Sequence, residues 1–254
     1  MPGAESRRIE RDTDADWRAI GERDPFWGVL NHEAYKADKL TPAAVADFYE
    51  SGREDMAAIV ARLTAAAGRP PRGRALDFGC GVGRLTEAMC GHAEAVTGYD
   101  ISPGMLAEAR RRGGRAHYVE ELPDGPFDWI NSRIVLQHIA PEQGCRLIEA
   151  LGQRLAPEGL ISLHLTVWRA PHRREPPDRG LKWLASPVLR RLRQARLPTG
   201  VIRMYDYDLG EVVEILARHD IAPISLWPED QDGHLGVTLY GQRADCAPHP
   251  PHSA

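Results

Sequence analysis

Three closely spaced glycines are the clearest sign of chemistry in this sequence. Gly79, Gly81 and Gly83 follow the apolar run ALDF, and glycines in such a place let the backbone approach a ligand. Their spacing is G-x-G-x-G, whereas the dinucleotide fingerprint G-x-G-x-x-G needs a glycine where Arg84 stands. The phosphate-binding pattern G-x-x-x-x-G-K-S/T is absent as well. The loop therefore favours a ligand that is neither a dinucleotide nor a nucleoside triphosphate.

Two carboxylates near this loop indicate the charge of the ligand. Asp77 stands just before the glycines, where it would repel a pyrophosphate and attract an ammonium or a sulfonium group. Asp100 ends the next apolar run, 17 residues after Gly83, and an acid at that place can accept both hydroxyls of a ribose. The pattern predicts a nucleoside that carries positive charge and no phosphate, a description that fits S-adenosylmethionine.

Four motifs follow one another along the chain in a fixed order. They are LDFGCGVGRLT, VTGYDISPGML, PDGPFDWINSRIVLQHI and LAPEGLISLHL. In this order they resemble the core motifs of class I S-adenosylmethionine-dependent methyltransferases, from about residue 72 to 168 and more weakly over 205–242. The resemblance implies an enzyme that uses S-adenosylmethionine, releases S-adenosylhomocysteine and has the Rossmann-like methyltransferase fold.

The resemblance also implies a role for single residues. Asp77 would lie near the amino group of the cofactor and Asp100 would hold its ribose, while Ile101 and Met105 would cover the adenine. Ser132 would offer its backbone near the methionine part. The implied cofactor contacts are Asp77, Gly79, Cys80, Gly81, Gly83, Asp100, Ile101, Met105, Glu121, Leu122 and Ser132.

The sequence departs from the family pattern on the adenine side. The family often has an acidic residue at the end of the third strand, and Tyr118 takes that place here. Glu120 or Glu121 would substitute for it, and Leu122 would contribute its backbone.

His138, in VLQHIAP, is the leading candidate for a catalytic base. It follows the predicted fourth strand, where open α/β sheets have their ligand crevice, and imidazole titrates near neutral pH. The alternative is that His138 only packs or hydrogen-bonds near the cofactor. None of the four cysteines has C-x-x-C spacing, so we expect reduced thiols and no metal site.

Aromatic and polar side chains outside these motifs are candidates for acceptor binding. They fall in the N-terminal helices, at the end of the fifth strand and before the last helix, and a core or lid-packing role is the alternative for each. The candidates are Trp27, Tyr35, Tyr49, Thr166, Trp168 and Tyr205.

Strands that alternate with helices must bring these residues together. The pattern predicts an α/β fold with a doubly wound, mostly parallel seven-stranded sheet, whose last two strands form an antiparallel hairpin. We expect the strands at 74–79, 95–100, 116–120, 127–133, 159–168, about 222–227 and 234–242, and the helices at 84–91, 102–112, 141–156 and 208–219.

Composition divides the chain into six segments. These are a disordered N-terminus 1–13, an N-terminal helical lid 14–70, a cofactor-binding core 71–168, a basic insertion 169–203 that caps the substrate, a C-terminal part of the core 204–243 and a disordered tail 244–254.

The basic insertion is compatible with more than one class of substrate. It holds ten Arg or Lys against two acidic residues, a net charge of +8, whereas the whole chain carries −4. It is either a solvated cap on an acidic body or a site that recruits an anionic substrate, and an RNA methyltransferase is one alternative. A non-catalytic binding protein is another. The absence of known RNA-binding signatures favours a small-molecule acceptor, with oxygen before nitrogen and carbon as the methylated atom.

The chain has no apolar stretch of about 18 residues and no signal-peptide pattern at its start. We therefore expect a cytoplasmic protein without a membrane span. Its oligomeric state is not predicted.

Overall fold

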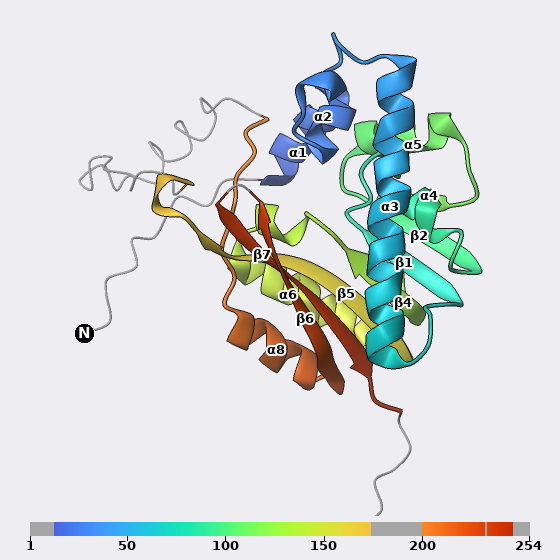
Figure 1. The fold of residues 1–254 in the computed structure, drawn as a ribbon, viewed down its shortest axis with the longest axis vertical. Helices are drawn as coiled ribbons and strands as arrows, with labels where there is room; N and C mark the ends of the chain where they lie inside the picture. Colours follow the sequence, from blue (N-terminus) through green and yellow to red (C-terminus); the bar gives the residue numbers. More distant parts are fainter. Residues whose placement is uncertain (1–12, 174–199, 232, 246–254) are drawn as a thin grey trace, which may run out of the picture.

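The computed structural model describes residues 13–173, 200–231 and 233–245 (Figure 1). Nearly all of the predicted N-terminal segment 1–13, most of the basic insertion 169–203 and most of the tail 244–254 lie outside the described residues. No helix within the described ranges is long and apolar enough to cross a membrane.

Seven strands in the described part of the chain form one sheet, in the order β3-β2-β1-β4-β5-β7-β6. Strands β1 to β5 pair in parallel, and β7 lies antiparallel between β5 and β6. This confirms the predicted doubly wound sheet with its closing hairpin. The strands are β1 Arg74–Phe78, β2 Ala95–Tyr99, β3 His117–Val119, β4 Phe127–Ser132, β5 Leu155–Arg169, β6 Ile221–Gln231 and β7 His234–Arg243.

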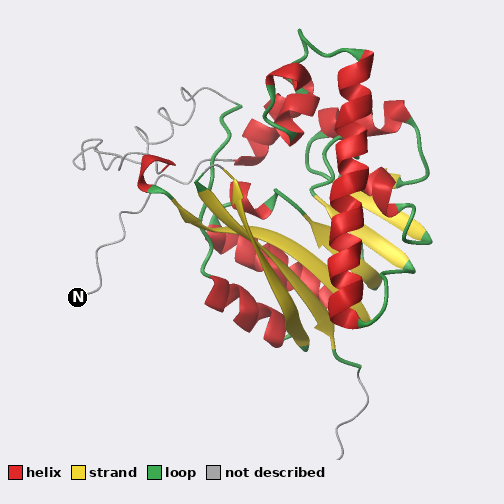
Figure 2. Cartoon of the chain, viewed as in Figure 1, coloured by secondary structure: helices red, strands yellow, loops and turns green. Residues whose placement is uncertain are grey.

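Helices cover both faces of the sheet (Figure 2). They are α1 Thr13–Arg23, α2 Pro25–Val29, α3 Pro42–Ala67, α4 Thr86–Met89, α5 Pro103–Arg112, α6 Pro141–Arg154 and α8 Leu209–Ala217, with 3-10 turns η1 Glu33–Tyr35, η2 Leu136–His138 and η3 Pro171–Arg173. Thr41 caps α3, because its hydroxyl accepts from Ala44 N at 3.2 Å. The predicted helix 84–91 was too long: Gly83, at φ +80°, keeps the chain in the loop, and α4 is a single turn.

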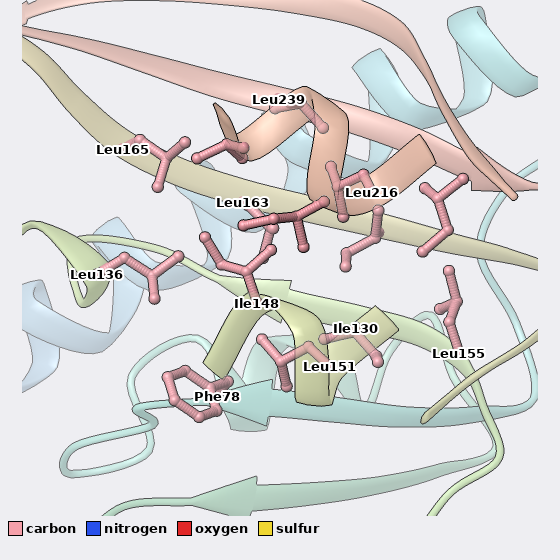
Figure 3. Close-up of a cluster of buried hydrophobic side chains, with 14 of the residues drawn as sticks. Phe78, Ile130, Leu136, Ile148, Leu151, Leu155, Leu163, Leu165, Leu216 and Leu239 are labelled. Carbon is pink, nitrogen blue, oxygen red and sulfur yellow. The ribbon is translucent and has the colours of Figure 1, made fainter. Parts of the chain in front are cut away.

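The alternation of side chains along β1 divides the core. Leu76 and Phe78 face α6 and α8 and belong to the larger apolar cluster, which Figure 3 shows in close-up. Ala75 faces α3 and belongs to a second cluster around Trp129. Because strand residues alternate between faces, Asp77 lies on the α3 side with Ala75. One face of the sheet is therefore apolar, while the other becomes polar toward its carboxyl edge.

Helices α1 and α2 lie over that carboxyl edge, whereas α3 packs against the face of the sheet. α1 packs against α5, and this contact requires glycine: a Cβ on Gly21 would overlap the hydroxyl of Ser102. The buried carboxylate of Asp16 accepts a hydrogen bond from Gly200 N at 2.8 Å, which ties α1 to the chain that leads into α8. The helical segment predicted as a lid is therefore held close above the sheet.

Candidate functional site

A cavity of about 160 Å³ lies at the carboxyl ends of β1, β2 and β4, beneath α1 and α2. Open α/β sheets bind their ligands at this edge. The sequence-predicted residues in its wall are Asp77, Gly79, Cys80, Gly81, Asp100, Ile101, Met105 and His138. Eight predicted residues from three stretches of the chain therefore meet around one cavity.

The glycine loop forms the floor of the cavity. Gly79 and Gly81 have positive φ angles of 75° and 52°, which side chains rarely adopt. A Cβ on Gly79 would overlap Val135, and one on Gly81 would come within 2.6 Å of Val29. Gly83 has a different role, since a Cβ there would overlap the Tyr118 hydroxyl outside the cavity wall. Two of the three glycines, Gly79 and Gly81, thus leave the backbone of the loop accessible to a ligand.

Asp100 is held in place by backbone donors. Its Oδ2 accepts from Gly81 N and its Oδ1 from Ser102 N, both at 2.9 Å. Burial raises its pKa to about 6, against the two hydrogen bonds. A carboxylate oxygen has two lone pairs, so each oxygen retains one acceptor site for a ligand hydroxyl.

Both carboxylate oxygens of Asp77 accept hydrogen bonds from side chains. Thr86 donates to Oδ2 at 2.7 Å and Asn131 Nδ2 donates to Oδ1 at 2.9 Å. Burial raises its pKa, and the charge of Arg84 opposes that effect. The carboxylate lines the cavity while joining α4 to β4, so its contact with a cofactor amino group stays a prediction.

His138 lies in η2 at the opposite side of the cavity from Asp100, after β4. Its Nδ1 lies 2.7 Å from the carbonyl oxygen of Arg203 and must donate there, because a carbonyl only accepts. Its Nε2 therefore carries the lone pair, which faces Gln137 Nε2 at 3.3 Å. The Trp17 ring lies 5.0 Å away. Burial lowers the pKa of His138 to about 4, so the imidazole is neutral at physiological pH.

Two arginines that sequence reasoning did not select also line the cavity. Arg84 donates to Asp55 Oδ2 at 2.8 Å, and Arg133 donates to both carboxylate oxygens of Glu229, at 3.4 and 3.1 Å. Arg133 follows β4 directly. Its position at the carboxyl end of a central strand is the sequence feature that could have predicted it as a residue of the cavity wall. Its partner Glu229 is 96 residues away along the chain, which no local pattern indicates.

The other predicted contacts do not line the cavity within the described part of the chain. Tyr49 is buried and donates to Val82 O at 3.0 Å, while Thr166 donates to Gln137 Oε1 at 3.1 Å. Trp168 is 46% exposed. Glu121 is exposed, Tyr118 donates to Glu87 at 2.8 Å, and the remaining residues outside the wall are Gly83, Leu122, Ser132, Trp27, Tyr35 and Tyr205. Their ligand contacts stay predictions.

The residues present fit a nucleoside with a positive charge. Backbone without side chains faces the cavity at Gly79 and Gly81, and Asp100 retains acceptor capacity for hydroxyls. Asp14 and Asp77 add carboxylates to the wall. No group of three or more side chains able to hold a metal ion occurs within the described ranges.

Comparisons with known proteins agree with this geometry. The family model described as a methyltransferase domain matches residues 49–208, which include the glycine loop, Asp100 and His138. Trans-aconitate 2-methyltransferase of Methylobacterium nodulans is 35% identical over 99 residues, which are 36% of this chain and 38% of that protein. Malonyl-[acyl-carrier protein] O-methyltransferase of Enterobacter lignolyticus is 32% identical over 121 residues, 44% of this chain and 45% of that protein. The matches thus span less than half the length of these relatives.

The fold has a counterpart among crystal structures. Magnesium protoporphyrin IX methyltransferase of Synechocystis PCC 6803 with bound SAH gives a TM-score of 0.61 at 20% identity. The match covers 92% of this chain and 100% of that chain. At this identity the similarity establishes the fold.

Proposed function

Because this chain belongs to the methyltransferase domain family, we propose that it transfers the methyl group of S-adenosylmethionine to an oxygen atom of a small-molecule acceptor. The observation that carries the proposal is the cavity in which the backbone of Gly79 and Gly81 lies beside the half-buried carboxylate of Asp100, which accepts a hydrogen bond from Gly81 N. When bound, the cofactor supplies an electrophilic methyl carbon on a sulfonium sulfur.

Different residues of this chain bind the cofactor and enclose it. Asp100 accepts the ribose hydroxyls, and its two backbone donors fix the direction of its lone pairs. The glycine loop admits the rest of the nucleoside without steric conflict. Trp17 and His138 close the other side and exclude water. Methyl transfer is an in-line displacement, so holding the acceptor in line supplies much of the rate.

The acceptor atom and the size of the acceptor are supported by different observations. The relative from Enterobacter lignolyticus is named an O-methyltransferase. The wall of the cavity is largely apolar, with Trp17, Val29 and Phe78 among its residues, which suits a small-molecule acceptor better than a charged polymer.

Calorimetry with S-adenosylmethionine and S-adenosylhomocysteine tests the proposal. Wild-type protein should bind both, and Asp100→Ala should lower the affinity at least about tenfold, because hydrogen bonds to a charged group are lost. Asp124→Ala, whose side chain is fully exposed, is the matched control and should bind normally. Failure of the wild type to bind either nucleoside would refute the proposed function.

A further inference from the structure

A chain of buried hydrogen bonds passes through η2 beside the cavity. It begins on β5, where the hydroxyl of Thr166 lies 3.1 Å from Gln137 Oε1. Gln137 Nε2 lies 3.3 Å from His138 Nε2, and His138 Nδ1 lies 2.7 Å from the carbonyl oxygen of Arg203. Thr166, Gln137 and His138 are all buried, so water competes little for these bonds. The chain therefore joins β5 and η2 to residues 200–207.

The carbonyl oxygen of Arg203 fixes the direction of every bond in this chain. A carbonyl oxygen only accepts, so His138 carries its proton on Nδ1. The buried ring is neutral and has its lone pair on Nε2, so Gln137 must turn its amide nitrogen toward that lone pair. The amide oxygen of Gln137 is then the group that accepts from Thr166. The one lone pair of the imidazole is therefore already engaged inside the protein.

Residues 200–207 run alongside η2 and are held there by several bonds. Tyr205 N donates to Gln137 O at 2.7 Å. The hydroxyl of Tyr207 lies 2.9 Å from each of two backbone carbonyl oxygens at η2. The Nδ1–H of His138 adds a side-chain bond between the same two stretches. Loss of that bond would leave a backbone carbonyl oxygen without its donor at the start of the contact.

The other end of this segment holds α1 in place. Gly200 N donates to Asp16 Oδ1 of α1 at 2.8 Å. The neighbouring Trp17 lies in the cavity wall, and so does Asp14 of the same helix. The ring centroid of Trp17 is 5.0 Å from that of His138. Through this segment and through Trp17, His138 contributes to the position of the helix that covers the cavity.

We propose that His138 is a positioning residue, whose Nδ1–H holds residues 200–207 against η2 and so keeps α1 over the bound nucleoside. Its Nε2 lone pair accepts from Gln137 and takes no proton from the methyl acceptor. The inference rests on the proposed function for the identity of the nucleoside. It gives His138 a role different from the catalytic base that the sequence predicts. Catalysis then depends on the alignment of acceptor and methyl group in the enclosed site.

Amide replacements of His138 test this role, because each amide reproduces one ring nitrogen. The side-chain nitrogen of asparagine lies near the place of Nδ1, whereas that of glutamine lies near the place of Nε2. His138→Asn should therefore keep the bond to the carbonyl oxygen of Arg203, and His138→Gln should lose it. His138→Leu fills a similar volume and has no donor.

The rate at which S-adenosylhomocysteine is released, measured by surface plasmon resonance, is the first readout. Release involves no proton from an acceptor, so a base without a positioning role would leave the rate unchanged in every variant. His138→Gln and His138→Leu should release the nucleoside about fivefold faster, as the loss of one hydrogen bond predicts, and His138→Asn should stay within about twofold of wild type. His92→Asn changes an exposed histidine and is the matched control, with an unchanged rate.

Two results of this experiment overturn the inference. One is an equal release rate in all variants. The other is a His138→Asn protein that releases the nucleoside as fast as His138→Leu or faster, because that order indicates packing against Trp17 and not a hydrogen bond.

The wild-type protein offers a second test that does not depend on the folding of any variant. In nitrogen NMR spectra of histidine-labelled protein, His138 should be neutral with its proton on Nδ1 at neutral pH; its signal is the one absent from His138→Asn. A proton on Nε2, or on both nitrogens, overturns the inference. This measurement needs no ligand. If the wild type binds neither nucleoside, the proposed function fails, while the spectrum still tests the bond from His138 to Arg203.

Discussion

The pH dependence of cofactor affinity depends on Asp100. Its pKa of about 6 lies above the ordinary value because burial disfavours the carboxylate. Protonation would take one of its oxygens away as an acceptor, while Gly81 N and Ser102 N still require both. A ligand that donates two hydroxyls therefore binds the ionised form. At pH 5, one unit below the pKa, about one molecule in ten has Asp100 ionised.

The expected change follows from this population. The apparent dissociation constant rises in inverse proportion to the competent fraction, so S-adenosylhomocysteine should bind about tenfold more weakly at pH 5 than at pH 7.5. Calorimetry at pH 5, 6, 7 and 8 measures it, and Asp100→Asn should bind weakly with a flat profile. The reasoning is refuted if wild-type affinity is constant over this range, or if the variant keeps the same slope.

The same shift has a consequence for stability without ligand. The pKa in the folded state is raised above the value of 3.8, so the folded state releases its proton only at higher pH than the unfolded state. Stability from this group is complete below pH 3.8 and is lost as the pH rises to about 6. Between pH 5 and 6 the loss is about 1 kcal/mol, because Asp100 in the folded state goes from about nine-tenths to about half protonated over this range.

Three further outcomes are expected. Gly79→Ala should destabilise the protein more than Gly68→Ala in urea unfolding, since both residues have positive φ, +75° and +71°, but only Gly79 has a side chain, Val135, against it; the left-handed backbone of Gly68 costs alanine about 1–2 kcal/mol. Turnover at saturating cofactor should be independent of pH between about 5.5 and 8.5, because the His138 pKa is about 4; a break near 6.5 would contradict the structure. Leu163→Ala should lower the free energy of unfolding by about 2–5 kcal/mol, measured by urea titration, because Leu163 is fully buried in the larger core cluster.

The features of the fold that depend on neighbouring residues were predictable from the sequence. The parallel strands around the glycine loop, the place of Asp100 after β2 and the closing hairpin follow from motifs and from the alternation of strands and helices. The caps of α3 and α5 have a local sequence signature too, because Thr41 and Ser102 each precede a proline. These features are set by residues within a few positions of one another.

The acceptor side was not predictable in the same way. Tyr49 has the size and polarity of a pocket residue. Its ring, however, packs against Phe26 and Phe48, and its hydroxyl donates a hydrogen bond to Val82 O. Large aromatic side chains are favoured both in the core and in ligand pockets, because both places bury their surface. The sequence alone therefore does not distinguish the two roles. Arg133 became notable only through Glu229, a contact that the fold creates across the sheet.

Asp77 lies where the sequence places it but makes different contacts from those first expected. The sequence predicts a carboxylate that meets a cationic ligand, and Asp77 does lie in the wall. Its two oxygens, however, hold Thr86 of α4 and Asn131 of β4. Asn131 in turn accepts from Ser162 of β5 at 2.8 Å, so one hydrogen-bonded row runs from the loop across three strands. A buried charge is costly unless it is hydrogen-bonded, and this row satisfies it while fixing the loop geometry. We therefore expect the negative charge of Asp77 to act on a bound ligand through its field, while its hydrogen bonds join α4 to β4 next to the glycine loop.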